Sequence, residues 1–179
     1  MKRMLVFGGL LLTLLLPAQL VQAQPVLKWY AFSQQSTPGM IPARVPRENG
    51  QPEIETPRVR TTYYIYVSLQ PTAKISLEKV WIGGKQYKAS FAPVDSTPVV
   101  NYTYTAGSSV ETTVMVPRTK LQVMQLVVDE VISQPDFKPS VQVSKMISKS
   151  ALVVSYRYKG KLYYSYTAKI KALTPQAYM

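Results

Sequence analysis

From Arg58 to the C-terminus, the chain is a series of short segments rich in β-branched and aromatic residues. They recur about every ten residues, and glycine, proline or small polar residues separate them. Several alternate apolar and polar side chains, a period of two that places every second residue on one face of a strand. Eight or nine such segments with almost no helical periodicity restrict the chain to antiparallel β architectures.

At this length we predict an all-β domain over residues 58–179, an antiparallel β-sandwich of immunoglobulin-like arrangement. The likeness is one of architecture only, because the chain has no cysteine and so lacks the disulfide core of antibody domains. Without cysteine, the burial of apolar side chains must stabilise the domain with no help from disulfides.

Two segments of this domain are ambiguous in their periodicity. The apolar residues of 121–132 fit a helix and a strand, but five of the twelve residues are β-branched, so we predict a strand over 120–128. We also predict a short strand over 141–147. Gly83-Gly84 is clearer, because two glycines that accept positive φ angles favour a two-residue hairpin turn.

The last hairpin turns at Lys159-Gly160 and has a clear apolar face on each strand. These faces contain Leu152, Val154, Tyr156 and Tyr158, then Leu162, Tyr164, Tyr166, Ala168, Ile170 and Ala172. A strict two-residue loop would set Tyr158 opposite Lys161 and mix the apolar and polar faces. Because a one-residue slip inverts every side chain, we predict an odd loop or a bulge that pairs Tyr158 with Leu162.

Residues 1–23 have the three parts of a secretory signal peptide. A positive start is followed by an uncharged, leucine-rich run over 4–16 and by small residues before Gln24. The alternative is a membrane anchor, but the run is shorter than the ~20 apolar residues that a spanning helix needs. We predict cleavage before Gln24 and export to the periplasm or cell envelope, or to the extracellular medium. We predict no transmembrane span in the mature chain.

Residues 24–57 combine a strand with a proline-rich arm. We predict a strand over 26–32 that docks onto the edge of the sheet, because its aromatic residues, including Trp29, favour burial. Residues 33–57 contain five prolines, which prevent both a helix and a strand ladder. The alternative is that the whole of 24–57 is a flexible tether ahead of the domain.

Positive charge is concentrated at the C-terminal end of the chain. Without Lys2 and Arg3, the mature chain has 19 basic and 9 acidic residues, and no acidic residue follows Asp136. Such an asymmetry indicates a surface whose field attracts an anionic partner. The alternative is a lysine-rich, solvated sheet face that protects against aggregation.

The chain lacks the residue types on which most catalytic sites depend. It has no histidine and no cysteine, which excludes the commonest general base and the commonest zinc ligands. Ser76 and Lys79 match the Ser-x-x-Lys pattern of penicillin-recognising enzymes, but on a strand their side chains would point in opposite directions. We predict no catalytic residue, no metal site and no cofactor. An enzyme would need an unrecognised carboxylate or serine–lysine site.

Tyrosine is abundant, with thirteen residues in the chain. Most of those in the last hairpin fall on the predicted apolar face, where they fill the core. Tyr163 falls on the lysine-bearing face beside Lys161, and it is our best candidate for an exposed aromatic contact. Asn101-Tyr102-Thr103 is an N-glycosylation sequon, which matters only if the organism glycosylates exported proteins.

The sequence favours a non-catalytic, exported interaction module. It would bind another cell-envelope or secreted protein through its sheet edge or its proline-rich arm. The alternative is a binder of an anionic glycan or another anionic polymer, and the compartment disfavours nucleic acid as a partner. The candidate binding residues are on the C-terminal hairpin and just beyond it: Arg157, Lys159, Lys161, Tyr163, Lys169 and Lys171.

Overall fold

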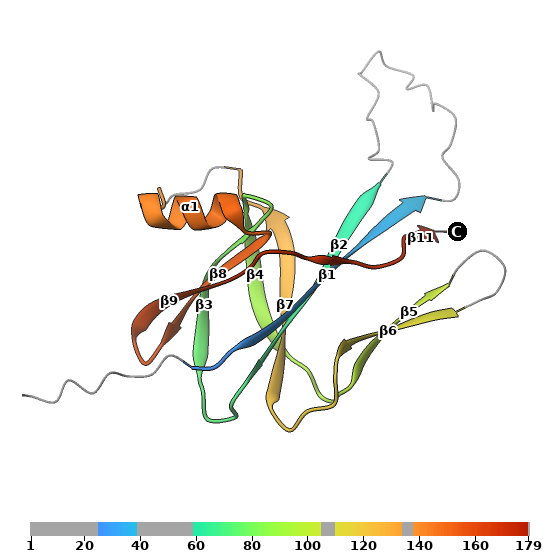
Figure 1. Cartoon of the computed structure of the whole chain (residues 1–179), viewed down its shortest axis with the longest axis horizontal. Helices are drawn as coiled ribbons and strands as arrows, with labels where there is room; N and C mark the ends of the chain where they lie inside the picture. The colour runs from blue at the N-terminus through green and yellow to red at the C-terminus, as the bar shows by residue number, and fades with distance from the viewer. Residues whose placement is uncertain (1–24, 39–58, 105–109, 134–137, 179) are drawn as a thin grey trace, which may run out of the picture.

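The structure, a computed structural model, describes residues 25–38, 59–104, 110–133 and 138–178. The described part is all-β with one short helix (Figure 1). Its elements are β1 (Lys28–Pro38), β2 (Arg60–Leu69), β3 (Ile75–Ile82), β4 (Lys85–Pro93), β5 (Val99–Tyr104), β6 (Val110–Val116), β7 (Gln122–Val131), α1 (Val141–Lys149), β8 (Leu152–Tyr158), β9 (Lys161–Thr167), β10 (Lys171–Ala172) and β11 (Gln176–Tyr178).

Nine strands form one sheet in the order β10-β1-β2-β7-β4-β3-β8-β9, with β11 also paired to β1. All neighbours are antiparallel except β10 and β11, which run parallel to β1. The strands β5 and β6 form a separate hairpin. The immunoglobulin-like sandwich stays a prediction, because these pairings do not confirm two facing sheets.

The main sheet is strongly curled. Its end strands β9 and β10 are seven inter-strand spacings apart, roughly 33 Å if the sheet were flat. Only residues 168–170 connect them, and that connection spans roughly 14 Å at full extension. The two ends of the sheet must therefore lie close together, and Figure 1 shows the chain crossing from β9 to β1.

The concave face of the curled sheet holds the main apolar core. Side chains from β2, β3, β7 and β8 meet there, and Ile170, from the crossing segment, packs against them. The fully or almost fully buried members of this cluster are Ile65, Val80, Ile82, Leu126, Leu152 and Val154. Because side chains of β2 and β8 belong to one buried cluster although three strands separate them, this face is the inside of the curl.

The convex face carries a second layer at each end. Over β1 and β2, the β5–β6 hairpin buries Phe32 and Tyr66 against Met115 and Val116. A polar network also ties the hairpin down: buried Gln34 donates to Thr103 Oγ1 at 3.0 Å and to the Thr174 carbonyl at 3.0 Å. Tyr64 donates to Gln34 Oε1 at 3.3 Å, so both ends of this buried amide are satisfied.

Over β3 and β8, the convex face is covered by α1. Ser140 caps this helix, because its Oγ accepts a hydrogen bond from Val143 N at 3.4 Å. Val143 is buried, whereas Val141 is 85% exposed. The strand predicted over 141–147 is therefore wrong. The Val-Gln-Val alternation suggested a strand, but the Ser140 cap and the spacing of Val143 and Ile147 suit a helix.

Two other predictions concern the strands themselves. The ambiguous segment 121–132 is strand β7, as its β-branched residues predicted. The N-terminal strand predicted over 26–32 is longer, because β1 continues to Pro38 and pairs with β2 through Ser36. The prediction that the proline-rich arm begins at residue 33 is therefore wrong for residues 33–38, because residues 33–37 contain no proline to interrupt the ladder. The strand β1 has neighbours on both sides, with β2 on one and β10 and β11 on the other.

The register predicted for the last hairpin is wrong. Tyr158 pairs with Lys161 and Tyr156 with Tyr163, which is a strict two-residue loop. Lys159 and Gly160 have φ angles of 49° and 77°, the positive values of a type I′ turn. This turn matches the twist of the strands, and it fixes the register although it mixes the predicted faces.

This turn gives a testable prediction. We expect Gly160→Ala to lower the free energy of unfolding by about 1 kcal/mol, because a Cβ disfavours positive φ. Lys159→Gly at the neighbouring position should be neutral or stabilising for the same reason. Urea denaturation measures both variants. An unchanged midpoint for Gly160→Ala would mean that the turn is not type I′ in solution.

The predicted signal peptide and most of the proline-rich arm lie outside the described residues. Within the described ranges, no helix has the length and apolar character needed to span a bilayer.

Candidate binding surface

The strand β9 is the end of the main sheet, and in the part of the chain that the structure describes no strand pairs with its outer edge. Tyr158 and Lys161 flank a two-residue turn, so they form a hydrogen-bonded pair. The pairing then alternates along the ladder. The backbone groups of Leu162, Tyr164 and Tyr166 therefore point away from β8, toward the free edge.

The same three residues place their side chains on the convex face. They pair with Arg157, Ser155 and Val153, which lie on the face opposite to the concave core. Leu162 is 45% exposed and Tyr166 is 61% exposed, while Tyr164 is half-buried. A free backbone edge thus coincides with a row of exposed apolar and aromatic side chains, which is unusual because sheet edges normally carry protective charges or proline.

A groove lies between this row and the helix. It has a volume of about 270 Å³ and is lined by Lys145, Met146, Lys149, Ser150 and Tyr166. Met146 is half-buried and Tyr166 forms the opposite wall, so the floor is apolar. Both lysines are exposed. The groove therefore offers an apolar surface with two positive charges beside it.

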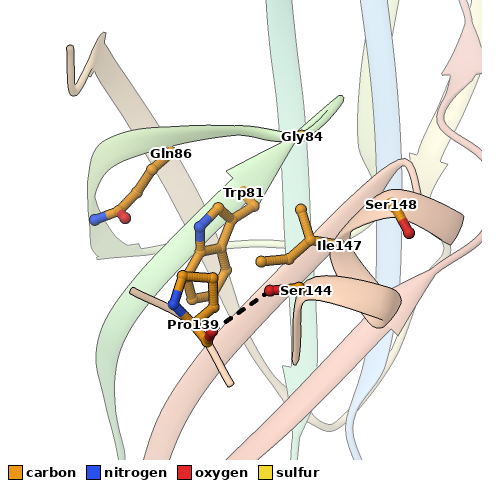
Figure 2. Close-up of a pocket in the computed structure, with 7 residues that line it drawn as sticks. All are labelled: Trp81, Gly84, Gln86, Pro139, Ser144, Ile147 and Ser148. Atoms are coloured by element: carbon orange, nitrogen blue, oxygen red, sulfur yellow. Dashed lines mark hydrogen bonds between the residues drawn. The ribbon is translucent and has the colours of Figure 1, made fainter. Parts of the chain in front are cut away.

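A second groove lies on the other side of the helix, against the β3–β4 hairpin. It has a volume of about 380 Å³, and its wall contains Trp81, which is only 5% exposed. Figure 2 shows Ile147 pointing toward the indole of Trp81 and Pro139 beside that ring. Ser144 donates to the Pro139 carbonyl at 3.5 Å. This groove therefore mainly marks the place where α1 packs against the β3–β4 hairpin.

Three of the predicted binding residues lie around the β8–β9 turn. Arg157 donates from Nε to Glu78 Oε1 at 2.6 Å, so its charge is already paired. Lys159 Nζ lies 5.3 Å from the centroid of the Tyr158 ring, above its face. Lys161 pairs with Tyr158 and is exposed. These residues form one cluster at the turn.

The other three predicted residues are elsewhere. Tyr163 is not the exposed aromatic contact that we predicted, because its half-buried ring stacks on buried Tyr156 with centroids 5.9 Å apart. Lys169 follows the far end of β9, roughly 20 Å along the strand from the turn. Lys171 is in β10, two residues after Lys169, and pairs with Phe32, so it too lies away from the turn. The six residues therefore do not share one surface.

The sequence reasoning missed Leu162 and Tyr166, which it assigned to the core face. The Lys159-Gly160 turn is the sequence feature that could have revealed their exposure, since a strict two-residue loop places both side chains on the convex face. It also missed Lys145 and Lys149, because their segment was predicted as a strand. On the helix they are one turn apart and line the same groove.

Ser76 and Lys79 are arranged differently from our prediction. A bulge between Leu77 and Lys79 sets Ser76 opposite Arg157 and Lys79 opposite Ser155. Arg157 and Ser155 are alternate residues of β8, so Ser76 and Lys79 lie on the same face. The pair nevertheless sits on a strand, whereas the Ser-x-x-Lys chemistry needs serine at a helix start.

The shifted tyrosine pKa values belong to the packed sheet rather than to β9. Burial raises the pKa of Tyr66, and neighbouring Tyr64 acts in the same direction. Burial also raises the pKa of Tyr87, with Tyr63 adding to the effect. Tyr63 and Tyr87 meet edge to face at 6.1 Å between ring centroids. Both shifts keep these hydroxyls neutral.

Comparisons with protein-family models, with curated proteins and with solved structures find no match to this chain.

Proposed function

We propose that this protein is a non-catalytic, exported interaction module that binds an extended segment of another cell-envelope or secreted protein along the free edge of β9. One observation carries the proposal. Leu162, Tyr164 and Tyr166 point their backbone N–H and C=O groups outward from the sheet, and the same three residues place their side chains on the convex face. A strand added there gains main-chain hydrogen bonds, and the side-chain row provides specificity.

The residues around this edge suit binding better than catalysis. Glu78 is paired with Arg157, and Thr174 donates a hydrogen bond to Glu111. With no histidine or cysteine in the chain, a catalytic site would have to use the remaining acids, serines and lysines. Of these groups, Lys145, Lys149 and Ser150 line the groove beside β9, and no acidic residue does.

The proposal predicts that Tyr164→Pro abolishes partner binding and preserves the fold. Proline removes an N–H that points away from β8, so the β8–β9 ladder loses no hydrogen bond, as at other edge positions. Loss of the Tyr164 backbone N–H, the middle donor of the free edge, should weaken partner binding at least tenfold. Tyr164→Thr is the matched control, because it also removes the ring and keeps the N–H and the β propensity.

The measurement is photo-cross-linking in the producing cells, with a photoreactive amino acid at Leu162. We expect one dominant cross-linked partner whose contact maps to an extended segment. The same cross-link should persist with Tyr164→Thr and disappear with Tyr164→Pro. A probe at exposed Val127, on β7, should not capture that partner. Equal capture by Tyr164→Pro would contradict binding along the β9 edge.

The alternative function, binding of an anionic glycan through the six predicted residues, has less support. These residues are divided between the hairpin turn, the far end of β9 and β10. A polymer could still bridge them, and such binding would weaken strongly at high salt.

A further inference from the structure

We propose that the segment added to β9 is acidic, with a carboxylate that pairs with Lys145 and Lys149 and an apolar residue that covers Leu162. This inference rests on the proposed function, because it specifies the chemistry of the strand that the β9 edge accepts. The six binding residues predicted from the sequence do not include Lys145, Lys149 or Leu162.

Charge complementarity is the first argument for an acidic partner. Lys145 and Lys149 both line the groove that Tyr166 closes. No acidic residue follows Asp136 in the chain, so the helix, β8 and β9 contribute only positive charge. Glu78, on neighbouring β3, is held by Arg157 at 2.6 Å. A second copy of this chain would present the same positive surface and repel the first, so a basic self-pairing is disfavoured.

The ladder geometry defines the order of the residues in the partner. An added strand places one side chain next to Tyr166 and another next to Leu162, both on the convex face. Because Leu162 and Tyr166 are four residues apart, the two partner residues are also four apart. The rest of this sheet's long strands are antiparallel, and antiparallel pairs are the commoner kind. In that direction the acidic residue precedes the apolar residue.

The side-chain lengths agree with this arrangement. The partner residue opposite Tyr166 has its Cβ roughly 5 Å from the Cβ of Tyr166. The lysine ammonium groups are at the ends of flexible four-carbon stems, which can reach across the groove to a carboxylate. The exposed side chain of Leu162 gains from an apolar partner, because 45% of its surface is open to water.

The test uses labelled nine-residue, threonine-rich peptides and fluorescence anisotropy on the full mature chain. One peptide has glutamate at its third position and valine at its seventh. A second has lysine in place of glutamate, and a third has the order of glutamate and valine reversed. A fourth repeats the first with an N-methyl group at its fifth position, which removes a main-chain donor.

We expect the first peptide to bind at least tenfold more tightly than the lysine peptide and more tightly than the reversed one. The double variant K145Q/K149Q should weaken that binding about three- to tenfold, the effect of two exposed ion pairs. K74Q/K120Q removes the same charge at two exposed loop positions away from the groove, and it should leave the affinity unchanged.

The outcomes separate this inference from the proposed function. If glutamate and lysine peptides bind equally, and both fail with Tyr164→Pro or with N-methylation, strand addition stands and the acidic specificity is overturned. If K74Q/K120Q weakens peptide binding as much as K145Q/K149Q does, the affinity depends on the net charge of the protein. The claim that the two groove lysines bind the carboxylate is then overturned. If no peptide binds, the inference is overturned, while the cross-linking experiment still decides the proposed function.

Discussion

Replacing Leu126 with alanine is expected to lower the free energy of unfolding by about 3 kcal/mol, within the 2–5 kcal/mol of such truncations. Leu126 has no exposed surface and lies in the concave core, in contact with residues from other strands of the curled sheet. The curl leaves this site little freedom to collapse, because strands pack around it from several sides. The truncation therefore leaves a cavity, which adds to the lost transfer free energy.

The matched control is the next residue on the same strand. Val127 is 36% exposed and faces the other side of β7, so Val127→Ala should change the free energy of unfolding by less than about 0.5 kcal/mol. Urea denaturation of both variants measures the difference. If the two variants are equally destabilised, Leu126 is not enclosed by a curled sheet, and the closure of β9 toward β1 would be in doubt.

The second large effect is expected at Trp81. Trp81→Ala should lower the free energy of unfolding by about 3–5 kcal/mol, because it removes a large buried ring between the sheet and α1. It should also remove the protection of α1 against amide hydrogen exchange. A nine-residue helix is too short to be stable alone, so its helicity depends on packing.

Hydrogen exchange followed by mass spectrometry separates the local effect from the global one. We expect peptides from 141–149 to exchange fully in Trp81→Ala while peptides from β2 and β7 remain protected. Trp81→Phe, which keeps an aromatic ring against Ile147, should retain most of the protection. Retained protection of α1 in Trp81→Ala would show that Val143 alone docks the helix. Because α1 supplies Lys145 and Lys149, its undocking should also weaken binding of an acidic peptide.

The predictions from sequence were most accurate where one strong local preference acted. The β-branched residues of 121–132 decided in favour of strand β7, and Gly83-Gly84 is a turn with both φ angles positive. The prediction failed at 141–147, where a short alternation of valine competed with a helix cap. The helix forms there because Ser140 caps it and Trp81 and the sheet pack against it.

The hairpin register shows why the candidate site could not be read from the pattern alone. Hydrophobic alternation determines register only where one face is buried and the other is solvated. β9 is an edge strand, so neither of its faces is completely buried: Tyr163 is half-buried on one and Tyr164 on the other. The turn at Lys159-Gly160 therefore decided the register, and it moved the exposed aromatic contact from Tyr163 to Tyr166.

The sequence by itself determined the all-β class, the positions of most turns and the concentration of positive charge after Asp136, because each depends on neighbouring residues. Only the tertiary structure decided which strands are neighbours and which edge remains free. The pairing of β1 with β2 and β10, and of β3 with β8, joins segments that are far apart in the chain. Such pairings depend on how the whole sheet curls around its core. Among the described residues, they leave the outer edge of β9 without a partner strand beside the basic helix.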